Sequence, residues 1–399
     1  MNHSILFVDD ERNVLQGLRR MLHGMRNVWE MHFAESGAEA LKLLSTTPAD
    51  VIVSDMRMPE MDGVELLTQV KADFPHMVRI VLSGHADHNS IMRTVRLAHQ
   101  YLSKPCDANR LKTAIDRAFA LKQLLADDAL RRQMSRMETL PALPTAYSRI
   151  MEALKDPECS IEQVGGIIAR DIAMTVKILQ LVNSAFYGIA RHVASPAEAA
   201  IYLGLDTIRA LVLTVGLFSD YAQSGIADHV VEAIYDHSLK TANLAREIAR
   251  STSMGKEQAE DAYMAGLVHD LGKLVIAHNM PKTYGELLKV TLEKQVAIQE
   301  AETRILGASH GRIGAYLIGL WGLPHSIVEA VAYHHNPRQC PSSEFDALGA
   351  VHVANALIHH RQTGNHVGDG VALIDYDYLA EMGMTAHLNE WLMLTEKAA

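Results

Sequence analysis

The first 120 or so residues alternate short apolar runs with segments of helical periodicity, and this alternation constrains the fold more than any other feature of the chain. The apolar runs predict five strands: Ile5–Val8, Met31–Ala34, Val51–Ser54, Ile80–Ser83 and Tyr101–Leu102. The periodicity between and after them predicts helices: Val14–Leu22, Ala38–Leu44, Gly63–Asp73, Asn89–Leu97 and one that starts near Asn109. We therefore expect an α/β domain with a doubly wound, five-stranded parallel sheet and helices on both faces.

The rest of the chain lacks this alternation. From Asn109 the helical pattern continues to Met137, which predicts one long connecting helix that stops before Pro141. Only helical periodicity follows, so we expect a multidomain protein in which an all-α region follows the sheet. The predicted boundaries are 1–122 for the sheet domain, 123–138 for a helical connector, 139–340 for a helical domain and 341–399 for a helical extension packed on it. The apolar positions of the connector leave a homodimer seam open as an alternative to a solvated linker.

Composition excludes several classes of function. The 399 residues carry 37 Lys and Arg against 47 Asp and Glu, without a long basic run, so we expect no direct binding of nucleic acid. No apolar stretch approaches the roughly 18 residues that suggest a membrane span, and the first residues do not have the pattern of a signal peptide. Cys106, Cys159 and Cys340 lie far apart. These features predict a cytoplasmic protein without a membrane segment.

Polar residues follow the predicted strands at their carboxyl ends, where parallel sheets bind ligands. Asp9 and Asp10 come after the first strand, Asp55 after the third, Ser83 ends the fourth and Lys104 follows the fifth. Three carboxylates in one pocket repel each other, and a hard divalent cation such as Mg²⁺ relieves that repulsion. A carboxylate beside the ion can attack a phosphoryl group while metal and ammonium stabilise its oxygens. Asp55 is the predicted nucleophile and Lys104 its counter-charge.

Each aspartate taken alone is well explained as a helix N-cap or a turn residue. The whole set, however, resembles the receiver domain of two-component response regulators over residues 1 to about 122. The segments that carry the resemblance are Ile5–Glu11, Asp55–Pro59 with Asp62–Gly63, Ser83–Gly84 and Tyr101–Pro105.

The resemblance to receiver domains implies a flavodoxin-like fold and phosphorylation of Asp55 by a sensor histidine kinase. It also implies that Asp9, Asp10 and Asp55 hold Mg²⁺. Ser83 and Tyr101 would switch conformation on phosphorylation. Tyr101 by itself is equally well explained as an ordinary half-buried aromatic residue.

The chain has 21 histidines, and the pair His269-Asp270 stands out among them. Imidazole and carboxylate are adjacent metal ligands there, and Lys273 follows one helical turn later. Further histidines lie on separate predicted helices or at their ends, where they could close around one or two metal ions: His237, His310, His334 and His335. Each of these four alone is better explained as a core or surface residue. Together with the pair, they predict a metal site as readily as a structural cluster.

This region resembles the HD superfamily of metal-dependent phosphohydrolases, whose ligands run His, His-Asp, His, His-His and a final Asp. The corresponding residues in this chain are His237, His269, Asp270, His310, His334 and His335. The resemblance implies a transition metal (Fe, Mn or Zn) at these residues and a phosphate contact from Lys273. Asn355 stands where the final carboxylate is expected, which removes a charge from the metal sphere and argues against hydrolysis. The Gly-Tyr-Pro signature of the cyclic-dinucleotide branch is also absent after the double histidine.

The helices before the histidines resemble the HDOD family, over about residues 137 to 340, at Leu140–Pro144, Ile178–Gly188 and Ala199–Gly204. HDOD domains are generally regarded as non-hydrolytic signalling or interaction modules. The sequence thus predicts a response regulator that takes phosphate on Asp55 and signals through an HDOD output domain to another protein. Two alternatives stay open: a metal-dependent phosphodiesterase for a cyclic dinucleotide, controlled by the receiver, and an adaptor that binds a cyclic dinucleotide without cleaving it. The pair His359-His360 is expected at a solvated helix end.

Overall fold

The computed structural model describes residues 3–83, 97–125, 127–135, 141–142, 149–150, 152–153, 156, 159–183, 193–205, 207–208, 219–220, 228–252, 254–340, 344–363 and 374–397. Three predicted features lie wholly or largely outside these ranges. They are the helix over 89–97, the motif over 140–144 and the second half of the motif over 178–188.

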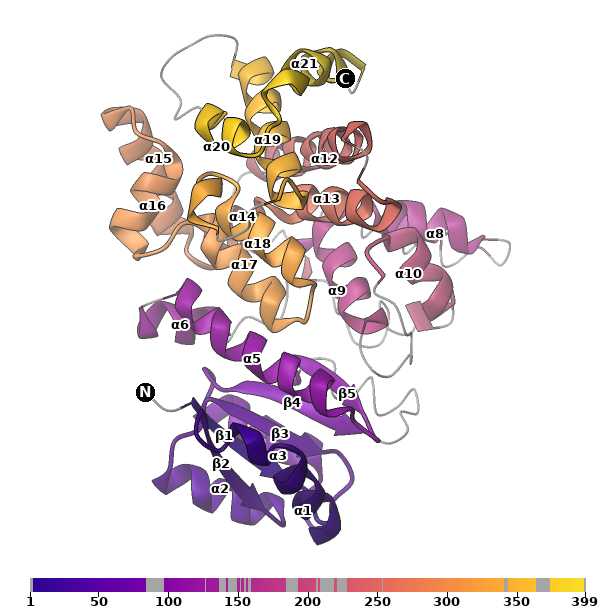
Figure 1. Ribbon diagram of the computed structural model, residues 1–399, viewed down its shortest axis with the longest axis vertical. Helices are drawn as coiled ribbons and strands as arrows, with labels where there is room; N and C mark the ends of the chain where they lie inside the picture. The colour runs from indigo at the N-terminus through magenta and orange to yellow at the C-terminus, as the bar shows by residue number, and fades with distance from the viewer. Residues whose placement is uncertain are drawn as a thin grey trace.

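Five parallel strands form one sheet in the N-terminal part of the molecule, in the order β2-β1-β3-β4-β5 (Figure 1). The strands are β1 His3–Val8, β2 Trp29–Ala34, β3 Val51–Asp55, β4 Val78–Ser83 and β5 Gln100–Ser103. The described helices of this domain are α1 Arg12–Met21, α2 Gly37–Thr46, α3 Gly63–Asp73 and α5 Ala108–Leu124. The predicted five-stranded parallel sheet is confirmed, and each predicted strand falls within an observed one.

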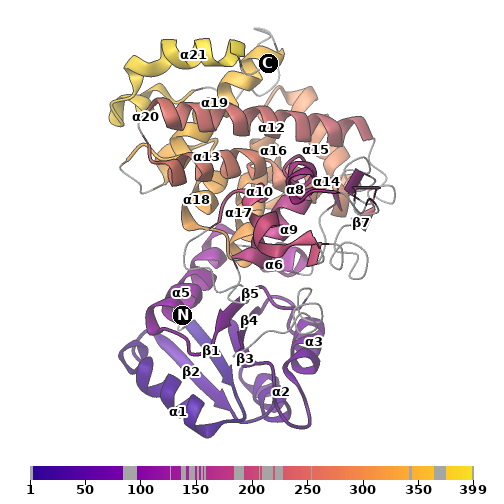
Figure 2. The same cartoon turned by 90° about the vertical axis from the view of Figure 1, so that its right-hand side faces the viewer.

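Successive side chains of the central strands point to opposite faces of the sheet and so belong to two different apolar cores. In β1, Ile5 and Phe7 belong to the core under α1 and α5, whereas Leu6 and Val8 belong to the core under α2 and α3. All four are at most 2% exposed, as expected for a strand that is buried on both faces. Figure 2 shows the two helix pairs on opposite sides of the sheet. The core under α1 and α5 is continuous with the core of the helical region.

The helix that leaves the sheet domain is interrupted, which differs from the single helix predicted over Asn109–Met137. α5 ends at Leu124, and a new helix, α6, covers Asp128–Ser135. The buried Leu125 lies in the turn, and Asp127 caps α6 by accepting the backbone N–H of Leu130 at 2.7 Å. An exposed aspartate in the interior of a helix does not stabilise the helix, whereas an aspartate at the N-cap accepts a hydrogen bond from a backbone N–H that has no partner within the helix.

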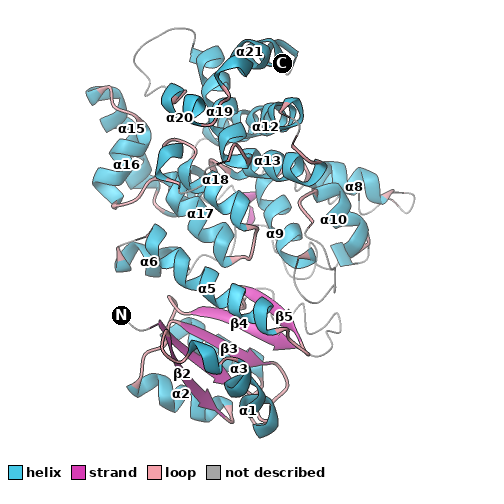
Figure 3. Ribbon diagram, in the orientation of Figure 1, coloured by secondary structure: helices cyan, strands magenta, loops and turns pink. Residues whose placement is uncertain are grey.

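The remaining described chain is almost entirely helical (Figure 3). Its helices are α8 Ile161–Ile168, α9 Ile172–Val182, α10 Pro196–Leu203, α12 Asp228–Ser251, α13 Lys256–Val268, α14 Leu271–Asn279, α15 Pro281–Lys294, α16 Ile298–Leu306, α17 His310–Leu320, α18 His325–Tyr333, α19 Ala347–Thr363, α20 Tyr376–Glu381 and α21 Leu388–Lys397. One parallel pair, β6 Pro141–Ala142 with β7 Ser219–Asp220, departs from the all-α prediction. Two-residue strands are too short to leave an alternating pattern in a sequence. No described helix combines the length and the apolar character that a membrane span requires.

The C-terminal segment packs on the helical region. The helix α12 contacts α13, α19 and α21. Trp391 of α21 is fully buried and donates its Nε1–H to Ser251 Oγ at 3.0 Å, while its ring stacks on Phe345. These contacts tie the last helix to the end of α12.

The two halves of the chain meet where α5 packs against α17 (Figure 1). A Cβ at Gly319 of α17 would come within 2.2 Å of the Leu121 side chain of α5, so the absence of a side chain permits this approach. Beside it, Gln100 donates its side-chain N–H to the Gly319 carbonyl at 3.4 Å, and Gln180 of α9 donates to the His99 carbonyl at 3.3 Å. Leu121 is thereby buried inside the chain, so it does not contribute to the exposed dimer seam considered above.

His99 is buried in this interface, and both of its ring nitrogens face N–H groups of Arg79. The Arg79 backbone N–H donates to Nδ1 at 3.0 Å, and a guanidinium nitrogen lies 3.0 Å from Nε2. Burial lowers the pKa of His99 well below its usual value of 6.5, and the charges of Arg79 and Lys177 lower it further. The folded interface therefore holds this imidazole neutral.

We expect this interface to lose stability in acid. As the pH falls below 6.5, the unfolded chain binds a proton on His99 that the folded chain does not bind, so the free energy of unfolding decreases. His99→Gln should flatten the dependence of this free energy on pH, measured by urea denaturation between about pH 7 and pH 5. The exposed His229 provides the control, because His229→Gln should leave the slope unchanged. Equal slopes for wild type and His99→Gln would contradict the prediction.

Candidate functional site

The carboxyl edge of the sheet brings one ammonium group and two aspartates into contact. Asp9 directly follows β1, Asp55 is the last residue of β3, and Lys104 follows β5. Lys104 Nζ lies 2.6 Å from Asp9 Oδ2 and 2.8 Å from Asp55 Oδ1, so it pairs with both carboxylates. Both aspartates are buried, and the lysine is half-buried. Three of the residues predicted for the pocket are thus joined by direct contacts.

Burial and hydrogen bonding have opposite effects on the pKa values of Asp9 and Lys104 in this pocket. Burial raises the pKa of Asp9, and hydrogen bonds from Lys104 and from the Glu11 backbone N–H offset only part of that rise. Burial lowers the pKa of Lys104, but its hydrogen bonds to Asp55 and Asp9 outweigh this effect and leave the pKa raised. Lys104 is therefore a cation at neutral pH, as a counter-charge for a phosphoryl group must be.

The other predicted pocket residues lie on, or just after, strands of the same sheet. Asp10 follows Asp9 and is exposed to solvent. Ser83 ends β4 at the same edge of the sheet, where its backbone pairs with Ser103. Tyr101 of β5 is 5% exposed and belongs to the core under α2 and α3. A role for Tyr101 as a switch therefore requires its ring to move out of this core.

A glycine lets α3 begin against the phosphoacceptor candidate. A Cβ on Gly63 would lie 2.3 Å from the backbone carbonyl oxygen of Asp55, a distance that no side chain tolerates. Asp62 accepts the Glu65 backbone N–H at 2.9 Å, and Glu65 accepts the Asp62 backbone N–H at 3.1 Å, which forms a capping box. The loop between β3 and α3 is thus fixed at both ends, and within it the Arg57 backbone N–H donates to Asp55 Oδ2 at 3.2 Å.

The charge of the pocket fits a divalent cation. Asp9, Asp10 and Asp55 bring three negative charges and Lys104 offsets one, which leaves a net charge of minus two. Carboxylate oxygens are the ligands that Mg²⁺ prefers, so these three aspartates would hold it. When bound, the ion would offset the negative charge of an incoming phosphoryl group.

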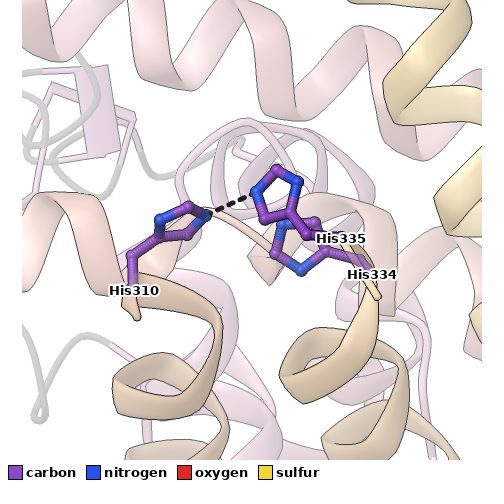
Figure 4. Close-up of side chains that lie close together, drawn as sticks. All are labelled: His310, His334 and His335. Carbon is purple, nitrogen blue, oxygen red and sulfur yellow. Dashed lines mark hydrogen bonds between the residues drawn. The ribbon is translucent and has the colours of Figure 1, made fainter. Parts of the chain in front are cut away.

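A second candidate site gathers six predicted residues from different helices. They are His237 of α12, His269 and Asp270 between α13 and α14, His310 at the start of α17, and His334 and His335 after α18. Their ligand atoms form two groups, each within 4.8 Å: His237 with His269 and Asp270, and His310 with His334 and His335. Figure 4 shows the second group, in which His310 of one helix points toward the two histidines at the end of another. The structure thus brings every predicted ligand into one region.

Hydrogen bonds on one ring nitrogen aim the other nitrogen into the cluster. His269 donates Nδ1–H to the Gly266 carbonyl at 2.7 Å, and His334 donates Nδ1–H to the Val331 carbonyl at 2.8 Å. In the neutral imidazoles Nε2 therefore carries a lone pair. Both Nε2 atoms are buried and have no hydrogen-bond partner within the described ranges. Buried acceptors of this kind are costly, and ligation of a metal would satisfy them.

Glu302 of α16 orients His310, and no sequence pattern pointed to it. Its Oε2 accepts both the backbone N–H and the Nδ1–H of His310, each at 2.7 Å, and both residues are fully buried. Nε2 of His310 lies 3.0 Å from His335 Nε2 and 3.3 Å from Asp270 Oδ1. Burial lowers the pKa of His310, but the charge of Glu302 and the hydrogen bonds of both carboxylates outweigh it and leave the pKa raised.

Asp270 links the two groups. Its Oδ2 lies 2.8 Å from Lys273 Nζ and 3.5 Å from His269 Nε2, while its Oδ1 lies 3.3 Å from His310 Nε2. Burial alone would raise the pKa of Asp270, but His269, Lys273 and His310 hold it well below its usual value. The cluster therefore contains an ionised carboxylate within reach of imidazoles from both groups.

A break between two helices presents this aspartate to the cluster. Helical periodicity predicts one helix over Glu257–Asn279, but α13 ends at Val268 and α14 begins at Leu271, with Asp270 at the N-cap position. A Cβ on Gly272 would lie 2.0 Å from the His310 carbonyl oxygen, so only glycine lets α14 approach α17 this closely.

Asn355 of α19 lies where the resemblance placed the final carboxylate. It is 1% exposed, and its Oδ1 lies 2.9 Å from His237 Nε2. Its Nδ2 is buried and makes no hydrogen bond in the part of the chain that the structure describes. A neutral carboxamide therefore faces the cluster beside His237.

Two further histidines of α19 border the cluster. His352 donates Nδ1–H to the His334 carbonyl at 2.7 Å and accepts the Asp375 backbone N–H on Nε2 at 2.9 Å. The prediction of a solvated helix end is wrong for His359, which is half-buried with its ring centre 4.3 Å from that of His237. The spacing of four residues from Asn355 was the signal that could have revealed it.

Burial keeps most of these imidazoles neutral. It lowers the pKa of His269 to about 4, and it lowers the pKa values of His334 and His335 well below 6.5. A neutral imidazole is the form that binds a metal. The donor set of several imidazoles and one carboxylate fits Zn²⁺, Fe²⁺ or Mn²⁺. When bound, such an ion would supply Lewis acidity to a phosphate oxygen.

Two protein-family models match different parts of the chain. Residues 5–116 match the family model described as the response regulator receiver domain, and residues 140–337 match the model described as the HDOD domain.

Individual relatives match parts of the chain. An uncharacterized protein of Treponema pallidum is 27% identical over 225 residues, which is 56% of this chain and 43% of that protein. The hydrogenase transcriptional regulatory protein HoxA of Cupriavidus necator is 30% identical over 215 residues, which is 50% of this chain and 44% of that protein. This chain thus spans less than half the length of these curated relatives. Among solved structures, the MmoQ response regulator of Methylococcus capsulatus is 21% identical with a TM-score of 0.48, over 64% of this chain and 98% of that one.

Asp55→Asn should abolish labelling of the protein by a small phosphodonor such as acetyl phosphate, because a carboxamide is a poor nucleophile. Chelation of Mg²⁺ should abolish labelling of the wild type as well. Mass spectrometry of the intact protein measures the incorporated phosphate. Asp73→Asn is the control, because Asp73 is an exposed aspartate at the end of α3. Labelling of an aspartate in Asp55→Asn would show that the pocket has been misassigned.

The double variant His269→Ala/Asp270→Ala should lose the metal bound to the helical domain, because it removes one ligand and the carboxylate shared by both groups. We expect the wild type, purified without oxygen, to carry metal detectable by elemental mass spectrometry. His229→Ala, which changes an exposed histidine, should retain the wild-type content. Metal retained by the double variant would locate the binding site elsewhere.

Proposed function

Because this chain belongs to the response regulators that join a receiver domain to an HDOD domain, we propose that a sensor histidine kinase phosphorylates Asp55 and that the HDOD domain passes the signal to another protein. The ion pairs of Lys104 with Asp9 and Asp55 support the first step, since they fix the cation that a phosphoryl group requires. We place this activity in the cytoplasm, with which the three free cysteines agree.

The observation that carries the proposal is that α17 connects the histidine cluster to the receiver domain. The helix begins at His310 in the cluster and ends at Leu320 beside the receiver domain, where Gly319 contacts Leu121 and Gln100. Its 11 residues span roughly 16 Å. A displacement of β5 or α5 therefore acts on an element that reaches the cluster without an intervening loop.

Phosphorylation would rearrange the contacts of Lys104. As one oxygen of the Asp55 carboxylate attacks the phosphorus, a P–O bond forms and the P–N bond to the phosphohistidine of the kinase breaks, so that the kinase imidazole leaves with the electron pair of that bond. The product is an acyl phosphate, and the ammonium group of Lys104 pairs with its phosphoryl oxygens. Lys104 lies one residue after β5 and four residues before α5, which begins at Ala108. The start of the helix that packs on α17 is thus coupled to the phosphoacceptor.

We assign the histidine cluster a metal-binding role without turnover. Its ligands would be His237, His269, Asp270, His310, His334 and His335, with Lys273 placed to contact a phosphate oxygen. Asn355 supports this assignment, because a neutral group beside His237 leaves less negative charge for the ions than the hydrolytic pattern provides.

One observation favours the alternative of a metal-dependent phosphodiesterase, namely that all six other ligands converge. Purified protein with and without phosphate on Asp55 should be assayed against cyclic dinucleotides. We expect no metal-dependent turnover in either state. Hydrolysis that disappears in His269→Ala/Asp270→Ala would establish the enzyme instead, and binding without cleavage would establish the adaptor.

Phosphorylation should change hydrogen exchange along 108–135 and at the end of α17, because these segments form the contact between the halves. The exchange of 264–272 should stay unchanged. Wild type and Asp55→Asn, each treated with the same phosphodonor and Mg²⁺, form the matched pair. An unchanged profile over 108–135 in protein shown to carry phosphate would refute the route through α5.

A further inference from the structure

The helix α16 carries none of the predicted ligands, yet it brings a buried carboxylate, that of Glu302, to the histidine cluster. Glu302 Oε2 accepts the backbone N–H and the Nδ1–H of His310, each at 2.7 Å, and both residues are fully buried. Its other oxygen, Oε1, is also buried and has no hydrogen-bond partner among the described residues. A buried carboxylate is costly unless positive charge lies near it. Glu302 therefore places a negative charge behind one imidazole of the cluster.

Glu302 binds the ring nitrogen of His310 that does not face His335. Because Nδ1–H donates to Glu302, the neutral ring of His310 carries its lone pair on Nε2. This Nε2 lies 3.0 Å from His335 Nε2, as the dashed line in Figure 4 shows. Two nitrogens bound to one ion at about 2.1 Å, with an angle of about 90–110° between them, lie roughly 3.0–3.4 Å apart. His310 and His335 are therefore at the spacing of two ligands of one ion.

The first group of ligands, the one that contains His237, is built differently. Nε2 of His237 lies 2.9 Å from Asn355 Oδ1. An ion that binds this nitrogen replaces the hydrogen bond and meets one imidazole and a neutral amide oxygen, which is a weak ligand for a transition metal. An ion between His310 and His335 also replaces one hydrogen bond, but both of the atoms that it meets are imidazole nitrogens. The second group thus offers the better ligands.

The acceptors behind the rings separate the two groups further. His269 of the first group and His334 of the second donate to backbone carbonyls, which carry partial charges. His310 of the second group donates to a carboxylate, which carries a full charge and makes the ring a stronger donor to a cation on Nε2. Solvent screens this charge little, because both partners are fully buried. Glu302 therefore strengthens metal binding in the second group.

We propose that Glu302 is a positioning residue that makes the second group, His310, His334 and His335, the tighter of two metal sites. The shared Asp270, whose Oδ1 lies 3.3 Å from His310 Nε2, would complete its four donors. The first group would fill only at a higher concentration of metal. The inference rests on the proposed metal-binding role of the cluster. It adds a residue outside the ligand series of the HD superfamily and an order in which the two groups fill.

The substitution Glu302→Gln separates the charge of this residue from its hydrogen bonds. The side-chain carbonyl oxygen of glutamine can still accept both N–H groups of His310, so the ring keeps its orientation and loses only the charge behind it. Glu300→Gln is the matched control, because Glu300 lies two positions earlier on α16 and is exposed. Metal-free, full-length protein should be titrated with Zn²⁺ in competition with a chromophoric chelator, and circular dichroism checks the fold of each variant.

We expect the wild type to bind two equivalents of Zn²⁺, one tightly and one weakly. Glu302→Gln should weaken the tight equivalent ~10–100-fold, the usual effect of losing a partner behind a ligand, and leave the weak one unchanged. Glu300→Gln should match the wild type. His335→Ala should remove the tight equivalent, whereas His237→Ala should remove the weak one. In a His310→Ala background, Glu302→Gln should cause no further loss, because Glu302 acts through that imidazole.

The outcomes separate this inference from the proposals on which it rests. Equal Zn²⁺ affinities of wild type and Glu302→Gln would overturn the role of Glu302 while the metal site stands. A loss that affects both equivalents, or that persists in the His310→Ala background, would overturn it too, because Glu302 would then only support the fold. Loss of the tight equivalent in His237→Ala would refute the order of filling, and this test does not require Glu302→Gln to fold. A wild type that takes up no Zn²⁺ would overturn the metal site as well, while phosphorylation of Asp55 is measured independently.

Discussion

The packing of α5 against α17 is the contact on which the relation between the two halves of the molecule depends. It is made by side chains of α5 against a glycine, Gly319, at the end of α17, and it extends the core of the sheet domain into the helical domain. Hydrophobic burial is non-directional, so this contact alone would allow α5 and α17 to slide along each other. The hydrogen bonds from Gln100 and Gln180 fix its register, because each ends on a backbone carbonyl of the other half.

Electrostatics explains why one imidazole of the cluster differs from the others. His310 lies between two carboxylates, with Glu302 on Nδ1 and Asp270 near Nε2, and its pKa is raised. His269 and His334 donate to backbone carbonyls, and burial lowers their pKa values. An isolated buried carboxylate costs several kcal/mol, so Asp270 needs cations near it. Lys273 provides one, and a metal ion would compete with a proton for His310.

The sheet and its pocket were predictable because the position of a residue relative to its strand in the sequence determines where that residue lies in the sheet. A residue that follows a parallel strand must lie at the carboxyl edge, so Asp9, Asp55 and Lys104 could be placed without a structure. The break at His269-Asp270 could not be predicted, because the apolar periodicity of the sequence continues across it. The start of α14 depends instead on its close contact with α17, which Gly272 permits. Partners such as Glu302 depend on tertiary packing, which leaves no local signal.

The helices that hold the cluster meet through backbone contacts rather than through side chains alone. A Cβ on Gly272 would lie 2.0 Å from the His310 carbonyl oxygen, and one on Gly311 would lie 2.8 Å from the Val331 carbonyl oxygen. Contacts of this kind have no rotamers through which to adjust, so α14, α17 and α18 move together if they move at all. A signal that reached α17 by the proposed route would therefore displace this unit relative to the receiver domain rather than rearrange the ligands within it. Such a displacement changes the surfaces that another protein can contact, and this agrees better with an interaction module than with a switched catalytic centre.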